Sequence, residues 1–143
     1  INALGGNIQN AYGISIEELK AAIPCGIGKI NVDTDIRLAV TRNMKEFFHQ
    51  NPAKRDSASI GKVYQLLEEK KEQFDPRAFL PPIMDTVMYG NIPDQDTADL
   101  VSVIEKGVKE AIGTLIVEFG SFGKAPLVEQ VSLEEMAERY KKM

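Results

Sequence analysis

The sequence is poor in cysteine and histidine, and this shortage excludes several kinds of site. Cys25 is the only cysteine, so no disulfide can form within the chain, which fits a reducing compartment such as the cytoplasm. His49 is the only histidine and falls in a different predicted element from Cys25, which argues against a catalytic thiol. One cysteine and one histidine also cannot make a closed zinc site. We expect Cys25 to be a small buried residue.

Long hydrophobic runs and an excess of basic residues are also missing. No apolar run approaches the roughly 20 residues that span a bilayer, and the N-terminus lacks the order of residues found in a signal peptide. The formal net charge is −4, without the basic surface of a general nucleic-acid binder. We therefore expect a cytoplasmic protein that binds neither membranes nor nucleic acid.

The sequence does contain helical patterns over most of its 143 residues. Ser15 and Glu18 form a capping box that predicts a short helix from about 16 to 22. The longest predicted helix is capped by Asp96 and contains Gly107 and Gly113, which we attribute to close packing against another helix. This longest helix is expected at 97–119. Another helix is expected to follow Asp33 and end at Asn51, and further helices are expected at 59–73, 82–89 and about 132–141, with a helical turn at 75–77.

One short segment has the pattern of a strand instead. Residues 27–32 are rich in β-branched side chains and lie between two predicted helices, as in a parallel α/β sheet. Because a single strand cannot form a sheet, the missing strands must lie elsewhere in a longer protein. The sequence therefore predicts an α/β fold of which this chain is a mostly helical piece.

Polar residues gather where that strand meets the next helix. Lys29, Asn31 and Asp33 alternate along the strand, so their side chains share one face, where burial without partners would be costly. The N-terminus of the following helix offers backbone N–H groups and a favourable dipole to an anion such as phosphate. Asp33 alone would be explained as a helix cap, but the whole segment favours a ligand site at the carboxyl end of the strand.

Four motifs in this order resemble class II, zinc-dependent fructose-bisphosphate aldolases. They are the stretch from Gly5-Gly6 to Glu18, GKINVDTDIR at 28–37, FDPR at 74–77 and FGSFGKA at 119–125. The resemblance implies the C-terminal part of a (β/α)8 TIM barrel. Residues 1–36 would be the end of the barrel, with its eighth strand and phosphate-binding turn. Residues 37–143 would be C-terminal helices with an intersubunit Asp-Pro-Arg element and dimerisation helices.

The resemblance also implies a reaction and site residues. The complete enzyme would cleave fructose 1,6-bisphosphate reversibly to dihydroxyacetone phosphate and glyceraldehyde 3-phosphate in glycolysis and gluconeogenesis. A zinc ion would polarise the ketone, and a monovalent cation is a second candidate cofactor. Asn31 would bind substrate hydroxyl or enediolate oxygens, while Asp33 and Thr34 would line the dihydroxyacetone phosphate pocket. Arg77 would reach the neighbouring subunit's site and hold the other phosphate, which requires a homodimer or a higher homo-oligomer.

The resemblance does not place all functional residues of the enzyme on this chain, and it leaves two alternative functions open. The family's zinc-binding histidines and proton-transfer acids cannot be placed here, so we expect this segment to be inactive without the N-terminal part of the barrel. Tagatose-bisphosphate aldolase uses the same scaffold and is one alternative. The other is a noncatalytic helical interaction module, which should fold alone as a monomer with a closed helical core. For the enzyme, residues 97–119 are the candidate dimer interface.

Overall fold

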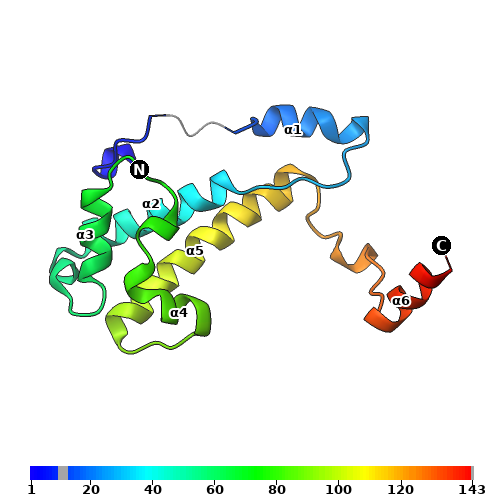
Figure 1. The fold of residues 1–143 in the computed structure, drawn as a ribbon. Helices are drawn as coiled ribbons and strands as arrows, with labels where there is room; N and C mark the ends of the chain where they lie inside the picture. The colour runs from blue at the N-terminus through cyan, green and yellow to red at the C-terminus, as the bar shows by residue number, and fades with distance from the viewer. Residues whose placement is uncertain (10–12, 143) are drawn as a thin grey trace.

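A computed structural model describes residues 1–9 and 13–142, and the regular elements of these residues are all helical (Figure 1). The α-helices are α1 (Ile16–Ala22), α2 (Thr34–Gln50), α3 (Gly61–Glu69), α4 (Met84–Tyr89), α5 (Gln95–Glu118) and α6 (Leu133–Lys141). The 3-10 turns are η1 (Asn2–Leu4), η2 (Ile23–Cys25), η3 (Pro52–Asp56), η4 (Pro76–Ala78), η5 (Pro81–Ile83) and η6 (Ala125–Leu127). None of the helices in the described part is long and apolar enough to cross a bilayer.

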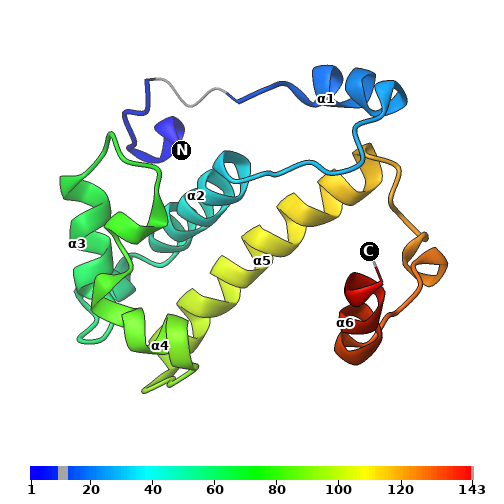
Figure 2. The ribbon, with the colours of Figure 1, turned by 45° about the vertical axis from the view of Figure 1, so that its right-hand side comes forward.

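The core lies where α2 packs along α5, with α3 and η5 closing one side (Figures 1 and 2). The helical spacing of the apolar residues on α2 predicts one buried face of Ile36, Val40, Met44, Phe47 and Phe48, and it is confirmed for all of them except Ile36. On α5 the same spacing predicts a stripe of Val101, Ile104, Val108, Ile112, Leu115 and Phe119, but the buried leucine is Leu100 and Ile112 is exposed. The buried apolar side chains are Val40, Met44, Phe47, Phe48, Ile60, Val63, Leu67, Phe79, Leu80, Ile83 and Leu100.

Side-chain caps decide where several helices begin. The predicted capping box of α1 is confirmed, since the Glu18 amide donates to Ser15 Oγ at 3.2 Å and the Ser15 amide donates to Glu18 Oε2 at 3.0 Å. The predicted cap of α5 is wrong. Asp94, not Asp96, accepts the hydrogen bond from the Thr97 amide at 2.9 Å, and the helix therefore begins two residues earlier.

The predicted strand at 27–32 does not form in the described residues, where this segment has no regular secondary structure. Its residues include Ile27, which is 47% exposed, and Cys25 before it is also exposed rather than buried as expected. The physical reason is the lack of a neighbouring strand, because a strand needs a second one to satisfy its backbone N–H and C=O groups.

The two glycines of α5 have different surroundings. A Cβ atom added at Gly107 would lie 2.8 Å from Asn43 Nδ2 and 3.0 Å from the carbonyl oxygen of Ala39, so close packing on α2 is confirmed there. At Gly113 the same atom would meet nothing within 4 Å, and the packing explanation is wrong for that position.

This contrast gives a matched pair of substitutions. Gly107→Ala should lower the free energy of unfolding by about 1–3 kcal/mol, because overpacking against α2 outweighs the gain in helix propensity. Gly113→Ala should raise it by up to about 1 kcal/mol, since only the propensity changes. Urea unfolding followed by circular dichroism measures both, and equal effects of the two substitutions would contradict the close contact at Gly107.

Candidate functional site

A polar stripe on α2 holds the segment that follows α3. Arg37, Thr41 and Lys45 are spaced four residues apart and therefore lie on one face of the helix. Thr41 Oγ1 donates to the carbonyl oxygen of Phe74 at 2.7 Å, immediately before the Asp-Pro-Arg element. The Lys45 ammonium donates to the carbonyl oxygen of Leu67 at 3.1 Å, one of the carbonyls left open at the end of α3. Burial lowers the pKa of Lys45, against the opposing charge of Glu68.

Arg37 joins the two segments that the sequence assigned to phosphate binding. Its Nε donates to Asp33 Oδ1 at 2.7 Å, and its Nη1 donates to Asp75 Oδ2. Asp33 directly precedes α2, whereas Asp75 precedes η4. The side chains of Arg37 and Asp75 are 28% and 23% exposed, so their contact is less screened than a surface ion pair, whereas Asp33 is 68% exposed.

Asp75 in turn orients Arg77. The Arg77 backbone amide donates to Asp75 Oδ1 at 3.0 Å, which confirms Asp75 as the cap of the turn. The Arg77 guanidinium contacts the same carboxylate, with Nε 3.0 Å from both oxygens and Nη2 2.5 Å from Oδ2. These hydrogen bonds, opposed by partial burial and helped by Arg37, lower the pKa of Asp75 to about 2. The pKa of Arg77 is raised, mainly by its hydrogen bond to Asp75.

The remaining predicted site residues lie at the start of α2 and before it. Asp33 is at the N-cap position, but its side chain makes no capping hydrogen bond and binds Arg37 instead. Thr34 is the first residue of the helix and is partly buried. Asn31 is exposed, and its Oδ1 accepts a hydrogen bond from Lys29 Nζ. The structure thus brings Asp33 and Arg77 into one charge cluster, which consists of Asp33, Arg37, Asp75 and Arg77, and it leaves Asn31 outside this cluster.

Arg37 and Asp75 are site residues to which the sequence analysis gave no such role. Arg37 lies in the motif at 28–37 without an assigned function, and Asp75 lies at the start of the predicted helical turn at 75–77. The spacing of four residues between Asp33 and Arg37 could have predicted their ion pair. The ion pair between Arg37 and Asp75 depends on the tertiary fold, and no local sequence pattern predicts it.

Within the part of the chain that the structure describes, metal ligands do not come together. His49 is exposed near the end of α2, and Cys25 is exposed at the end of η2. Across residues 1–9 and 13–142, no three His, Cys, Asp or Glu side chains are placed to hold a metal ion. These residues therefore do not fit a zinc site of the kind that needs three or four protein ligands.

Comparison with known proteins identifies the family. The family model for class-II fructose-bisphosphate aldolase matches residues 8–124, which contain two of the four motifs in full and most of the other two. The chain belongs to this family. The match confirms the resemblance seen in the sequence, and it includes Asn31, Asp33, Thr34 and Arg77 within its bounds.

The curated relatives of this chain are named as fructose-bisphosphate aldolases. A fructose-bisphosphate aldolase of Nostoc sp. is 31% identical over 142 residues, covering 99% of this chain and 28% of the relative. One from Xanthobacter flavus is 31% identical over 140 residues, covering 98% and 28%. A fructose-bisphosphate aldolase 2 of Rhodobacter capsulatus is 26% identical over 140 residues, covering 98% and 88%. The chain thus spans little more than a quarter of the first two relatives. No solved structure matches it.

The charge cluster makes stability depend on pH in a defined direction. Because the pKa of Asp75 is about 2 in the folded chain and 3.8 ordinarily, its contribution is present above about pH 4 and is lost as the pH falls towards 2. Asp75→Asn should therefore lower the free energy of unfolding by about 1–2 kcal/mol at pH 7 and by almost nothing at pH 2. Urea midpoints measured between pH 7 and pH 2 test this.

Asp56→Asn is the matched control, because Asp56 is exposed in η3. Its effect should stay within about 0.5 kcal/mol at every pH. A loss at Asp75 that does not change between pH 7 and pH 2 would show that the carboxylate charge is not what stabilises the turn.

Proposed function

We propose that this chain is the C-terminal portion of a class II, zinc-dependent fructose-bisphosphate aldolase. The complete enzyme would cleave fructose 1,6-bisphosphate reversibly to dihydroxyacetone phosphate and glyceraldehyde 3-phosphate, in the cytoplasm, as a step of glycolysis and gluconeogenesis. The names of the relatives support this reaction. The observation that carries the proposal is the contact of Arg37 with both Asp33 and Asp75, because it joins two phosphate-binding segments that lie far apart in the sequence.

Within the complete barrel, residues 1–36 would supply the eighth strand and the phosphate-binding turn. Asn31 would bind oxygens of the three-carbon ketone, and Asp33 and Thr34 would line its pocket. The first amides of α2 suit its phosphate, because the Asp33 side chain does not cap them. Residues 27–33 form no helix, so neighbouring strands could pair with this segment and bring Asn31 towards the other two.

Residues 37–143 would supply the helices and the intersubunit element. Arg77 is 71% exposed at its side chain, and within the described residues its hydrogen bonds to Asp75 use only Nε and Nη2. Nη1 is therefore directed elsewhere and could donate to a phosphate oxygen of the substrate in the neighbouring subunit. Asp75 fixes the plane of the guanidinium, which lowers the entropy lost when the phosphate binds.

The other parts of the proposal concern the rest of the assembly. The zinc ligands, and those of any monovalent cation, would come from the part of the enzyme outside this chain. A homodimer, or a higher oligomer, would use α5, where Ile112, Ile116 and Val117 expose apolar surface on the half of the helix beyond the core.

Two alternatives retain some support. Tagatose-bisphosphate aldolase would use the same residues, and assays with both sugar bisphosphates separate the two enzymes. The closed core of α2, α3 and α5 would also suit a noncatalytic helical module. The family match favours the enzyme.

The test is Arg77→Ala in the complete enzyme. The value of kcat/KM for fructose 1,6-bisphosphate should fall about a hundredfold, because a charged donor to the distant phosphate is lost. Affinity for dihydroxyacetone phosphate, measured by titration calorimetry, should change less than about twofold, because that ligand lacks the second phosphate.

Arg42→Ala removes an exposed arginine of α2 that pairs with Glu46, and it should leave both quantities unchanged. Equal losses for the bisphosphate and for dihydroxyacetone phosphate would assign Arg77 a different role. An active complete enzyme that prefers the tagatose isomer would replace the proposed substrate with the alternative one.

A further inference from the structure

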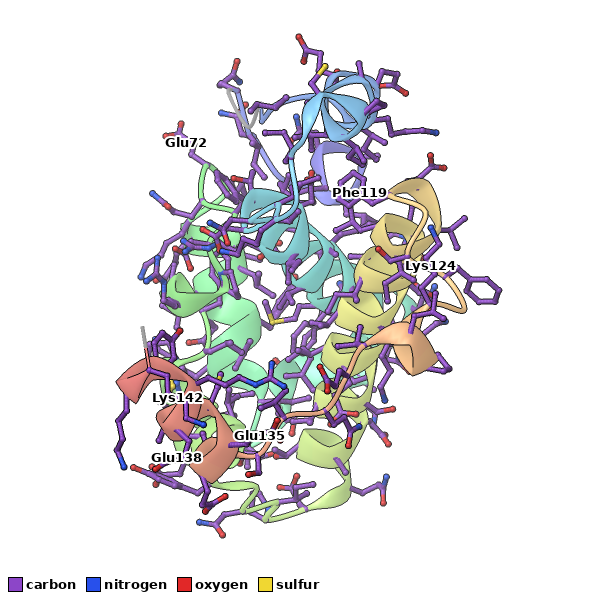
Figure 3. All side chains as sticks on the ribbon, turned by 90° about the vertical axis from the view of Figure 1, so that its right-hand side faces the viewer. Glu72, Phe119, Lys124, Glu135, Glu138 and Lys142 are labelled. Atoms are coloured by element: carbon purple, nitrogen blue, oxygen red, sulfur yellow. The ribbon has the colours of Figure 1, made fainter. Side chains whose placement is uncertain are left out.

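One cation of the charge cluster has no role in the proposed function. Arg77 would bind a phosphate and Asp75 holds Arg77, whereas Arg37 donates to two carboxylates. Its Nε donates to Asp33 Oδ1 at 2.7 Å, and its Nη1 donates to Asp75 Oδ2. Asp75 belongs to the segment after α3, and Figure 3 shows Glu72 of that segment in the same upper part of the molecule as the first turns of α2, which carry Arg37.

Arg37 and Arg77 share the Asp75 carboxylate. Arg77 Nε lies 3.0 Å from both oxygens, and Arg77 Nη2 and Arg37 Nη1 both donate to Oδ2. The side chains of Arg37 and Asp75 are 28% and 23% exposed, so solvent screens their contact only in part. Because two guanidinium groups hold this carboxylate, it cannot turn away from Arg77 without breaking its contact with Arg37.

The second guanidinium also changes the charge that a phosphate would meet at Arg77. An arginine paired with one carboxylate forms a neutral unit, whereas two arginines on one carboxylate leave one positive charge in excess. Asp33 offsets this excess, but its side chain is 68% exposed and its charge is therefore more strongly screened. Without Arg37, two carboxylates would stand beside a single guanidinium, and their net negative charge would oppose a phosphate.

The backbone of the Asp-Pro-Arg turn is held by contacts other than those of Arg37. Thr41 Oγ1 donates to the carbonyl oxygen of Phe74 at 2.7 Å, directly before the turn. Phe79 and Leu80, which follow the turn, are buried in the core. Loss of Arg37 should therefore leave the turn in place and change only how its carboxylate and its arginine are held.

We propose that Arg37 is a positioning residue for phosphate binding: it holds the Asp75 carboxylate and keeps positive charge in excess beside it, so that Arg77 remains a ligand for phosphate. This role rests on the proposed function, in which Arg77 grips the phosphate distant from the ketone. It makes the phosphate affinity of Arg77 depend on a residue of α2 that does not itself touch the substrate.

The first experiment compares Arg37→Gln with the wild type in the complete enzyme by steady-state kinetics. The KM for fructose 1,6-bisphosphate should rise about tenfold while kcat changes less than about twofold, because the weakened contact binds substrate and transition state alike. A purely structural role for Arg37 predicts a different result. A partly unfolded enzyme has fewer active molecules, which lowers the apparent kcat and leaves KM unchanged, and that outcome would overturn the proposal.

A double-mutant cycle tests whether Arg37 acts through Arg77. Adding Arg37→Gln to the Arg77→Ala variant should change KM less than about twofold, because the side chain that Arg37 positions is already missing. The same tenfold rise of KM in both backgrounds would contradict the proposal, since Arg37 would then act through Asp33 or through the fold.

Lys70→Gln is the matched control. Lys70 also brings a positive charge to this turn, but it donates to the carbonyl oxygen of Ala78, at 3.2 Å, rather than to the Asp75 carboxylate. Its KM should stay within about twofold of the wild-type value, and a tenfold rise would show that any nearby positive charge has the effect assigned to Arg37.

The kinetics also separate the two proposals. An unchanged KM in Arg77→Ala would contradict the proposed function itself. A raised KM in Arg77→Ala together with an unchanged KM in Arg37→Gln would overturn only the positioning role of Arg37.

Discussion

The hydrogen bonds and ion pairs made by one face of α2 determine where the candidate site lies. Arg37, Thr41 and Lys45 share that face, and each binds a different point on the chain between Leu67 and Asp75. Neighbouring positions of the same helix, such as Met44 and Phe48, point into the core. The register of α2 against the core therefore determines the position along α2 at which Asp75 and Arg77 are held. A rotation of α2 about its axis would cost apolar burial and these polar contacts together.

The close approach at Gly107 supports that register. Asn43 of α2 donates a hydrogen bond to the carbonyl oxygen of Val103 at 2.9 Å and occupies the space that a side chain at residue 107 would need. The two helices thus pack together through the Asn43 side chain, which fills the space beside Gly107, as well as through apolar contacts. Because the site-bearing end of α2 extends from this contact, the stability of the helical pair and the geometry of the Asp33–Arg37–Asp75 cluster depend on the same packing.

Sequence reasoning succeeded where the determining interaction is local. The capping box at Ser15 and the Asp-Pro turn at Asp75 involve partners two or three residues away, and both were predicted. The cap of α5 was assigned to Asp96, but Asp94 lies two residues away, and only the backbone geometry decides which carboxylate reaches the Thr97 amide. The strand at 27–32 failed for the opposite reason, since its partners would have to come from other strands.

The candidate site also contains one part that local patterns predicted and another part that depends on the tertiary fold. The chemistry of Asp33 and Arg77 was predicted from the motifs, but their connection through Arg37 and Asp75 required the fold, because ion pairs across 38 residues leave no periodic pattern. Asn31 is the informative exception. It lies only two residues before Asp33, yet it is separated from the cluster, because the segment that carries it has no sheet to fix its side-chain direction. The helical part of the site is thus organised by this chain alone, and the strand part needs neighbours.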